Sequence, residues 1–313
     1  MIKVLAPGLQ SSIQDTTPRN GIEFGISNGG TTDSRAAALG NIILGQQESC
    51  PVLEIVRSPV KFQFMEACTI AITGFGMDFK LKDDQKVESW KIQHIPKNSV
   101  LIGRPTTTGF RSYICVQGGF KADLFDDTYG TDLRLGLGGS CRALKKEDLL
   151  IVNGHERNLK SGTWRISHDL TAYPTQKNIR IMPGPEISWF DHGAVHRFIK
   201  SSWKIDSNSD RMGIRLKNDF SLPMPSKEML STVVIPGTIQ ITSSGPIILF
   251  VDAQTTGGYP RIGQVCAVDL PVLAQKAPGD EILFEWITPE QAIRLQDSAQ
   301  REIQQIKSAI SLH

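Results

Sequence analysis

The chain has 313 residues, of which 40% are hydrophobic and 21% charged, and its 34 basic and 32 acidic side chains leave a formal net charge of +2. This composition is typical of a folded globular protein and excludes a disordered chain. The charges are spread without a Lys/Arg-rich run, which argues against a nucleic-acid-binding protein.

The N-terminal half predicts one helix followed by strands. The helix begins near Thr32 or Asp33 and ends at Gly45. Segments rich in Val, Ile and Thr then predict strands at Ala67–Thr73 and Ser112–Val116.

The C-terminal half continues with short strands around a second helix. The predicted strands are Asn178–Met182, Val233–Ile241, Pro246–Val251 and Glu281–Trp286. The helix should start near Asp191 and place Val195, Phe198 and Ile199 on one face.

The last helix has the clearest start. Thr288 offers a capping hydroxyl, Pro289 occupies the first helical position and Gln291 stands three residues after the cap. The apolar residues that follow at spacings of three and four are Ala292, Leu295, Ala299, Ile303, Ile306 and Ile310. This stripe should pack on the body of the protein or on another chain.

These elements predict a mainly β protein with a few helices, a sandwich or barrel rather than alternating β-α units. The 28 glycines and 17 prolines fit many tight turns. Polar residues around Trp164–Thr175 separate two strand-rich halves. We therefore expect an N-terminal β-rich subdomain at 1–170 and a C-terminal subdomain with the terminal helix at 171–313.

The cysteines and the N-terminal residues predict the cellular compartment. Five cysteines, at positions 50, 68, 115, 141 and 266, are scattered without a Cys-x-x-Cys pair, as is typical of reduced core thiols. Residues 1–8 lack the apolar stretch of a signal peptide, and no uncharged segment approaches the length of a membrane span. We expect a cytoplasmic protein with no membrane partner.

Common catalytic motifs are absent from the sequence. It contains no Walker A loop and no G-x-S-x-G elbow. His192 and His196 lie four apart on the predicted second helix, where two ligands can face one metal. No Glu follows His192 and no third ligand is near in sequence, so we interpret both as surface histidines and predict no metal site.

The segment 252–260 is the strongest candidate for chemistry. It follows the apolar run Ile247–Val251, so a buried strand should deliver its polar groups to one edge of a sheet. The groups are Asp252, Gln254, Thr255, Thr256, Gly257, Gly258 and Tyr259. Glycines allow positive φ and close approach of backbone N–H groups, which can form an anion- or carbonyl-binding nest. The alternative is a strand followed by an ordinary Thr-Gly-Gly turn with a capping Asp.

Two further polar clusters have open interpretations. Arg211 and Arg215, four residues apart, can clamp a carboxylate or phosphate, or form an ion-pair network with Asp210. Gln240, at the end of Pro236–Gln240, can bond an amide substrate or satisfy a turn.

These clusters carry a resemblance to a known family, and the agreement runs nearly end to end. The strings concerned are Ile13–Asp15, Thr131–Gly139, Met182–Pro185, Ser209–Leu216, Val234–Gln240, Asp252–Pro260 and Ala267–Pro271. Together they resemble the allophanate hydrolase subunit 2 family, also called KipA or biotin-dependent carboxyltransferase-like proteins.

The resemblance implies a fold of two cyclophilin-like β-barrel units and a role in a complex. With two partner subunits, a smaller one of the KipI-like B type and one of the LamB/YcsF-like A type, such a chain forms the bacterial 5-oxoprolinase. That complex uses ATP to hydrolyse 5-oxo-L-proline to L-glutamate, and the ATP site is not located in this chain. The alternatives are carboxyl transfer from biotin to urea-type substrates, and a KipA-type regulatory module that only binds a KipI-like partner.

Three N-terminal strings depart from the family pattern. Asp15 continues with Thr16-Thr17 where relatives usually have Gly-Arg, and Gly30-Thr31-Thr32-Asp33 replaces the usual Gly-Ala-Met-Asp. Asp127–Thr131 replaces Gly-Ser-Arg-Ser-Thr, and the loss of this arginine bears on substrate preference. Asp33 is interpreted either as a helix N-terminal carboxylate or as a catalytic group.

The substrates implied by the resemblance share a carbonyl flanked by nitrogen, so catalysis must stabilise charge on oxygen, where one preorganised donor is worth ~3 kcal/mol. We expect Thr256, Gly257 and Gly258 to hold that oxygen or its phosphate. Gln240 and Gln254 would fix the ring amide, and Thr255 would also bind the substrate. Arg211 or Arg215 would pair with the substrate carboxylate, and Asp252 or Tyr259 would transfer a proton.

Overall fold

The computed structural model describes residues 1–154, 165–225 and 227–311. The described residues form two compact units. The first comprises Met1–Pro18, Gly29–Pro174 and Glu302–His313, and the second comprises Arg19–Asn28 and Thr175–Arg301. Our single cut near residue 170 therefore differs from the structure, because residues 19–28 and 302–313 group with the unit that they contact. Trp164, at the start of the expected boundary, lies outside the described residues.

In the part of the chain that the structure describes, the first unit contains two antiparallel sheets. The six-stranded sheet has the order β11 (Leu149–Leu150), β1 (Ile2–Ala6), β4 (Val60–Phe64), β9 (Val100–Pro105), β6 (Met77–Leu81) and β7 (Lys86–Val87). The five-stranded sheet has the order β2 (Ser11–Gln14), β3 (Val52–Val56), β10 (Arg111–Val116), β5 (Cys68–Gly74) and β8 (Ile92–Ile95). The two sheets bury a shared apolar core that includes Phe62 and Ile114.

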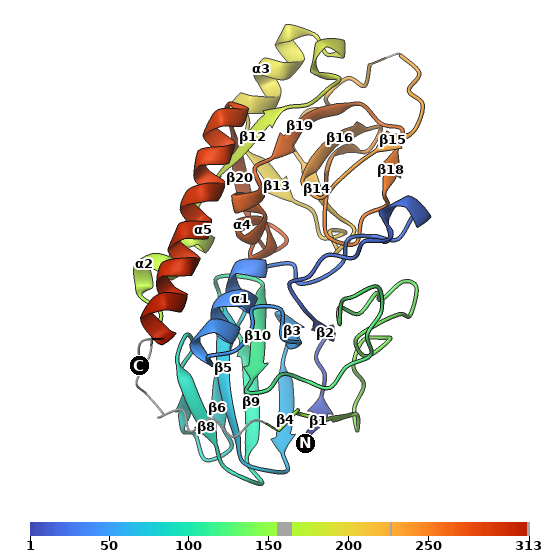
Figure 1. The fold of residues 1–313 in the computed structure, drawn as a ribbon. Coiled ribbons are helices and arrows are strands. Elements are labelled where there is room, and N and C mark those ends of the chain that lie inside the picture. The colour runs from blue at the N-terminus through green and yellow to red at the C-terminus, as the bar shows by residue number, and fades with distance from the viewer. Residues whose placement is uncertain (155–164, 226, 312–313) are drawn as a thin grey trace. The chain divides into compact units, whose positions relative to one another are not determined.

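Helix α1 (Ser34–Ile43) covers the other face of the five-stranded sheet, along β5 and β10 (Figure 1). The core there joins Leu39 of α1 to Tyr113 and Cys115 of β10. Ile303, Ile306 and Ile310 pack against the same core. The apolar stripe of the last helix therefore packs on the body of the protein at these three positions, one of the two predicted outcomes.

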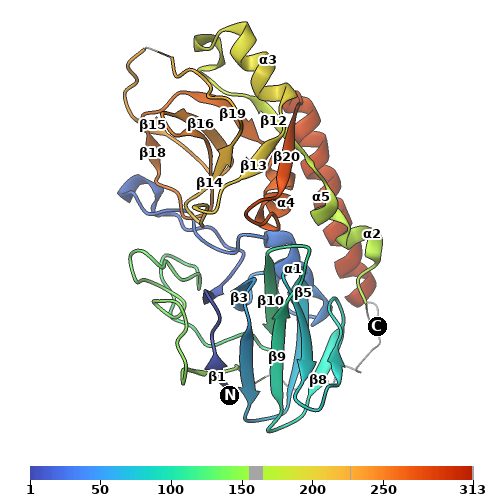
Figure 2. The ribbon, with the colours of Figure 1, turned by 180° about the vertical axis from the view of Figure 1, so that it is seen from behind.

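The second unit is a closed barrel, seen from behind in Figure 2. Its strand order is β12 (Asn178–Pro183), β19 (Arg261–Val265), β16 (Thr238–Thr242), β17 (Gly245–Leu249), β14 (Gly213–Lys217), β13 (Trp203–Ile205) and β20 (Glu281–Trp286). β12 pairs in parallel with β20, and the remaining neighbours are antiparallel. A separate ladder joins β15 (Thr232–Val233) to β18 (Thr256–Gly257).

The prediction of a mainly β protein with a few helices is confirmed. One barrel is closed, whereas the strands described for the first unit form two separate sheets. The predicted strand Val233–Ile241 is divided between β15 and β16, because Pro236 has no N–H to donate and Gly237 has a φ of 89°. The remaining helices are α2 (His168–Thr171), α3 (His192–Lys200), α4 (Leu270–Ala274) and α5 (Pro289–Ser311), with 3₁₀ turns η1 (Gly21–Phe24), η2 (Tyr173–Thr175), η3 (Ile187–Trp189) and η4 (Ala267–Asp269).

The three predicted helix starts are confirmed by their caps. The side chain of Asp33 accepts from the Ala36 N–H, and Asp191 caps α3 in the same way through the Ala194 N–H. At α5 the Thr288 hydroxyl accepts from the Gln291 N–H while the Gln291 side chain accepts from the Thr288 N–H, a complete capping box. Within the described ranges, α5 and the other helices all fall short of the combined length and apolarity that a membrane-crossing helix requires.

The five cysteines are free thiols, but they differ in exposure. Cys115 and Cys266 are buried, as expected of core thiols, and Cys50 and Cys68 are half-buried. Cys141 is exposed, so the prediction of a core position is wrong for this residue.

Candidate functional site

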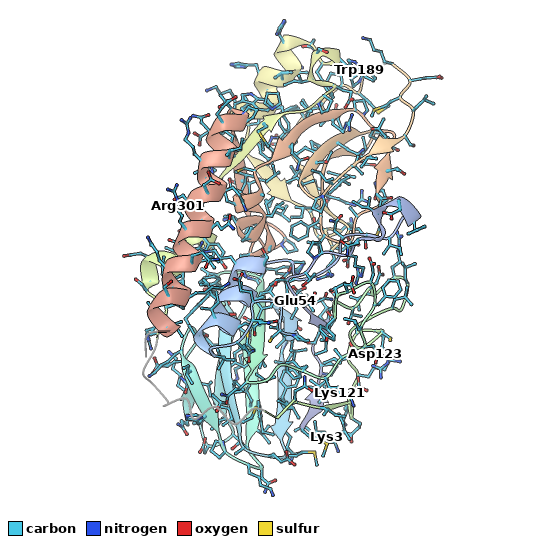
Figure 3. The ribbon with its side chains drawn as sticks, viewed as in Figure 1. Lys3, Glu54, Lys121, Asp123, Trp189 and Arg301 are labelled. Atoms are coloured by element: carbon cyan, nitrogen blue, oxygen red, sulfur yellow. The ribbon has the colours of Figure 1, made fainter. Side chains whose placement is uncertain are left out.

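A buried group of acids and phenols lies where α1 begins beside the five-stranded sheet. Glu54 lies in the middle of β3 (Figure 3). It is the cross-strand neighbour of Tyr113 on β10. Its Oε2 accepts hydrogen bonds from the Thr32 N–H, the Thr32 hydroxyl and the Tyr113 hydroxyl, each at 2.8 Å. Glu54 is 3% exposed and Tyr113 is fully buried. We call Thr32, Asp33, Glu54, Tyr113 and Tyr173 the carboxylate cluster.

Asp33 connects the two phenols of the carboxylate cluster. Its N–H donates to the Tyr113 oxygen at 2.8 Å, and its Oδ2 accepts from the Tyr173 hydroxyl at 2.6 Å. Burial raises the pKa of both tyrosines well above its ordinary value, and the neighbouring carboxylates raise it further. Both phenols therefore stay protonated at neutral pH and serve as hydrogen-bond donors to fixed acidic groups.

The three N-terminal strings that depart from the family pattern meet beside this cluster. Asp15 Oδ1 accepts from the Thr128 hydroxyl at 2.6 Å, and its Oδ2 accepts from the Tyr129 N–H at 2.8 Å. The Asp15 carbonyl accepts from the Thr31 N–H at 2.8 Å. Segments more than a hundred residues apart are thus joined through one buried aspartate.

In the second unit, Asp252 and Arg211 bind each other. The Arg211 Nε and Nη2 donate to the two Asp252 oxygens at 2.6 and 3.0 Å. Both side chains are nearly buried, with exposed fractions of 4% for Arg211 and 11% for Asp252. Arg211 thus forms an ion pair with Asp252, whereas the ion-pair alternative drawn from the sequence named Asp210 as the acid.

Gly257 lies in a strand rather than in a nest. The prediction of a Thr-Gly-Gly turn is wrong, because Thr256 and Gly257 form β18 and neither Gly257 nor Gly258 has a positive φ. The Val234 N–H donates to the Thr255 carbonyl. In an antiparallel ladder, hydrogen-bonded residue pairs alternate with non-hydrogen-bonded pairs. Thr232 and Gly257, two positions along, are therefore a hydrogen-bonded pair. The Gly257 N–H therefore donates within the β15–β18 ladder.

Gln240 packs behind this ladder. It is buried on β16, and its Nε2 donates to the Tyr259 carbonyl at 3.3 Å. A Cβ added at Gly257 would lie 2.5 Å from Gln240 Nε2, so the Gln240 amide would have to shift to admit it. The structure thus gives Gln240 a role in holding the segment 252–260.

Gly257→Ala should destabilise the protein by roughly 1–3 kcal/mol, because the new methyl group displaces the Gln240 amide. Gly258→Ala is the matched control, since its methyl group would meet no atom closer than Ser231 Oγ at 3.3 Å. Urea denaturation of both variants measures the difference. Equal midpoints for Gly257→Ala and the wild type would contradict this packing.

The other predicted site residues differ in exposure. Thr256, Gly258 and Tyr259 are exposed, Tyr259 to 44%, whereas Thr255 is buried and Gln254 half-buried. Arg215 points to solvent from β14, so the structure does not place it with Arg211 as a clamp. His192 and His196 are also exposed, as expected of surface histidines.

Arg261 and Glu186 anchor the edge of the same barrel. The Arg261 Nε and Nη2 donate to Glu186 at 2.7 and 2.6 Å, and its Nη1 donates to the Val233 carbonyl of β15 at 3.2 Å. The hydrogen bonds from the Arg261 side chain hold the pKa of Glu186 below its ordinary value, against the opposing effect of burial.

The pH dependence of Glu186→Gln follows from this lowered pKa. A carboxyl group whose pKa is lower in the folded than in the unfolded protein stabilises the fold at pH values above its unfolded-state pKa. This contribution is lost as the pH falls through the folded-state pKa. At pH 7 the variant should lose roughly 2 kcal/mol of unfolding free energy relative to the wild type. The difference should shrink steadily below about pH 4, and urea denaturation across this range measures it. A difference that is independent of pH would contradict the ion pair.

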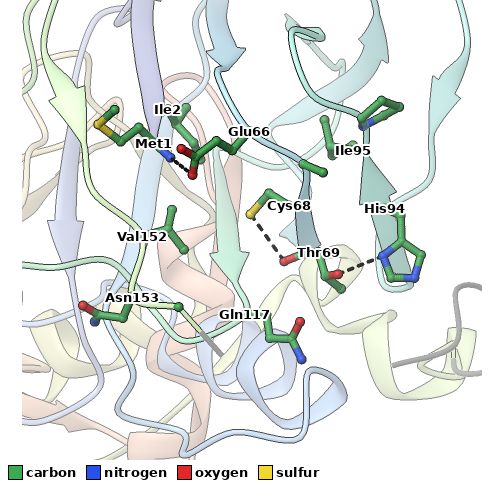
Figure 4. Close-up of a pocket in the computed structure, with 13 residues that line it drawn as sticks. Met1, Ile2, Glu66, Cys68, Thr69, His94, Ile95, Gln117, Val152 and Asn153 are labelled. Atoms are coloured by element: carbon green, nitrogen blue, oxygen red, sulfur yellow. Dashed lines mark hydrogen bonds and ion pairs between the residues drawn. The ribbon is translucent and has the colours of Figure 1, made fainter. Parts of the chain in front are cut away.

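A cavity of about 700 Å³ opens in the first unit at the ends of β5 and β8 (Figure 4). Thr69 Oγ1 lies 2.8 Å from His94 Nδ1, but the two residues are an ordinary cross-strand pair. The Met1 amine lies 3.5 Å from Glu66 Oε2. Burial raises the pKa of the Cys68 thiol to about 11, which disfavours the reactive thiolate. These groups favour a structural surface over a catalytic site.

Comparison with known families defines the class of the protein. The model of the carboxyltransferase domain, subdomain A and B, matches residues 24–286. The chain belongs to this family, which agrees with the resemblance read from its motifs.

Its relatives fall into two functional groups. The chain is 32% identical to the C-type subunit of the Escherichia coli 5-oxoprolinase over 98% of this chain and 97% of that protein. It is 33% identical to the C-type subunit of the Haemophilus influenzae 5-oxoprolinase over 99% of both. It is also 27% identical to the urea amidolyase of Saccharomyces cerevisiae over 95% of this chain, but only 17% of that longer protein.

Solved structures give the same fold. The urea carboxylase of Kluyveromyces lactis matches 97% of this chain with a TM-score of 0.85 and 26% identity. The urea amidolyase of the same yeast matches 97% with a TM-score of 0.85 and 25% identity. This chain spans 29% and 20% of those two proteins, respectively.

Glu54 and Tyr113 were missed by sequence reasoning. The available signal was a single acid inside an apolar strand, Val52-Leu53-Glu54-Ile55-Val56, because an unpaired charge is rarely buried. Tyr113 gave no comparable signal, because an aromatic residue in a strand is ordinary.

Proposed function

We propose that this chain is the C-type subunit of an ATP-dependent 5-oxoprolinase complex, active with partner subunits, that hydrolyses 5-oxo-L-proline to L-glutamate. The observation that carries the proposal is 32–33% identity to the C-type subunits of two 5-oxoprolinases, covering nearly all of both chains. The partner subunits would be of the KipI-like B type and the LamB/YcsF-like A type. ATP would be consumed by the complex, with no binding site assigned to this chain.

The carboxylate cluster supports an amide-opening role. Opening a cyclic amide requires a base that activates water and a donor that protonates the leaving nitrogen. Glu54 is a carboxylate held by three donors, and Tyr113 is a protonated phenol 2.8 Å from it. We assign Glu54 as the general base that takes a proton from the attacking water and returns it to the leaving nitrogen as the C–N bond breaks, and Tyr113 as its positioning residue. Asp33 and Tyr173 fix the start of α1 beside them.

The segment 252–260 keeps a proposed substrate-binding role through its exposed groups. Thr256, Gly258 and Tyr259 are accessible to a ligand, and the buried pair Arg211–Asp252 supports the loop that carries them. The predicted contacts of Gln254 with the ring amide, of Thr255 with the substrate and of Arg215 with the substrate carboxylate remain proposals.

Co-purification with the KipI-like and LamB/YcsF-like proteins, followed by an assay of glutamate release from 5-oxoproline, tests the proposal. The expected result is glutamate formation that requires ATP and all three subunits. A stable three-subunit complex without such turnover would reject it.

Carboxyl transfer is the second candidate, and the similarity to urea amidolyase and urea carboxylase favours it. Biotin would then be the carboxyl carrier and a urea-type amide the acceptor. Carboxylation of urea upon addition of a biotin carboxylase and biotin carrier, in the absence of 5-oxoproline turnover, would favour this reading.

A further inference from the structure

The surroundings of Glu54 act on its charge in opposite directions. Glu54 is 3% exposed, and burial disfavours the ionised form of a carboxyl group. Asp33, whose carboxylate caps α1 and accepts from the Tyr173 hydroxyl, adds like charge beside it. Arg111, at the start of β10, adds positive charge close to Tyr113. The donors that reach the Glu54 carboxylate therefore matter for its ionisation.

Thr32 supplies two of the three donors described above. Its N–H and its hydroxyl both lie 2.8 Å from Glu54 Oε2, and the third donor is the Tyr113 hydroxyl. Hydrogen bonds to an ionised acceptor are shorter and stronger than those between neutral groups, and they favour the charged form. Thr32 is 2% exposed, so its hydroxyl is shielded from bulk water.

The distances indicate that the hydroxyl hydrogens of Thr32 and Tyr113 both point at Glu54. The two hydroxyl oxygens lie 3.1 Å apart, whereas each lies 2.8 Å from Glu54 Oε2. Each hydroxyl has one hydrogen, and an ionised carboxylate is a stronger acceptor than a second hydroxyl. Burial, and then the neighbouring carboxylates, raise the pKa of Tyr113, so this phenol keeps its hydrogen at neutral pH. The N–H at position 32 belongs to the backbone, whereas the hydroxyl is a property of threonine.

We propose that the Thr32 hydroxyl holds the buried Glu54 carboxylate in its ionised form, which makes Thr32 a positioning residue for the base. The catalytic consequence rests on the proposed function, because only an ionised Glu54 can take a proton from water. Without the hydroxyl, burial and the charge of Asp33 would favour the protonated acid. The charge of Glu54 is a property of this chain, so it is measurable without turnover.

Infrared titration of the purified full chain tests the inference. A protonated carboxyl group gives a C=O stretch that a carboxylate lacks, and the part of this signal that disappears in Glu54→Gln belongs to Glu54. The wild type should lack this band at neutral pH. Thr32→Val keeps the backbone N–H and the size of the side chain. Its Glu54 band should appear about one pH unit higher than in the wild type, roughly a tenfold shift of the protonation equilibrium.

Four variants separate the hydroxyl from packing. Thr32→Ser keeps the hydroxyl and should titrate like the wild type, whereas Thr32→Ala should shift like Thr32→Val. Thr242→Val is the matched control, because it removes a buried hydroxyl that donates to the Gly245 carbonyl at 2.9 Å rather than to an acid. It should leave the Glu54 band unchanged, and circular dichroism checks that each variant is folded.

Three results would overturn the inference. They are a Glu54 band already present in the wild type at neutral pH, equal midpoints for the wild type and the variants without the hydroxyl, and a shift in Thr32→Ser as large as in Thr32→Ala. Each would show that the hydroxyl does not control the charge of Glu54.

The kinetic consequence is measured separately in the assembled complex. The pH at which kcat/KM of glutamate release falls on the acid side should rise in Thr32→Val by the same amount as the infrared midpoint. A shifted infrared midpoint with an unshifted rate profile would support the inference but reject Glu54 as the base. Failure of the proposed function is therefore distinguishable from failure of the role of Thr32.

Discussion

Asp252→Asn is expected to lower the free energy of unfolding by about 3–5 kcal/mol. The pair with Arg211 is nearly buried, and two hydrogen bonds of 2.6 and 3.0 Å join the charges. Asparagine keeps the shape of the side chain but removes the charge, so the buried guanidinium loses the carboxylate that neutralises it. Urea denaturation followed by tryptophan fluorescence measures the loss.

A double variant separates charge from packing. Arg211→Met combined with Asp252→Leu should unfold closer to the wild type than Asp252→Asn, because an apolar pair replaces both charges together. Glu281→Gln, at an exposed hydrogen bond to Ser202, is the surface control and should change little. Asp252→Asn with near-wild-type stability would show that the pair is not a stabilising contact. Turnover retained by the double variant in the assembled complex would exclude a proton-transfer role for Asp252.

Glu54→Gln is expected to reduce kcat of the assembled complex by roughly 10²–10⁴-fold, the usual contribution of a general base. The amide keeps the shape of the side chain and most of its packing in β3 but cannot take a proton at neutral pH. Glu54→Asp, which retains a carboxylate, should recover part of the lost turnover. Steady-state kinetics of glutamate release measure both variants.

The carboxylate cluster offers a second test of the same assignment. Tyr113→Phe removes a donor to Glu54 and the acceptor of the Asp33 N–H, so kcat should fall while KM changes less. Glu147→Gln, an exposed glutamate of the same unit paired with Lys3, should leave turnover unchanged. Full turnover by folded Glu54→Gln would exclude Glu54 as the general base. This conclusion would hold whether or not the chain is a subunit of a 5-oxoprolinase complex.

The helix starts were predictable because capping is local. Asp33, Asp191 and the Thr288–Gln291 box each satisfy N–H groups within three residues, so the relevant physics is contained in a few letters of sequence. The division of the predicted strand 233–241 into two strands also has a local cause. Pro236 has no N–H to donate, and the prediction overlooked this.

The candidate site was less predictable because its partners are distant in sequence. Arg211 meets Asp252 across 41 residues, and whether an arginine binds an internal acid or a substrate cannot be read from its neighbours. The glycines at 257 and 258 suggested a turn, yet Gly257 lies in β18, where a Cβ would press on the Gln240 amide. Spacing along the chain identified a polar segment but not which of its atoms were already bonded.

By itself the sequence determined the β-rich class of the protein, its helix caps and the family to which its motifs belong, since propensity, capping and motif identity are properties of short segments. Only the tertiary structure decided that residues 19–28 and 302–313 change units, and that Asp15, Thr31 and Thr128 converge. The reason is that burial and strand register choose partners across the whole chain, and a buried hydrogen bond forms only where the fold brings its two ends together.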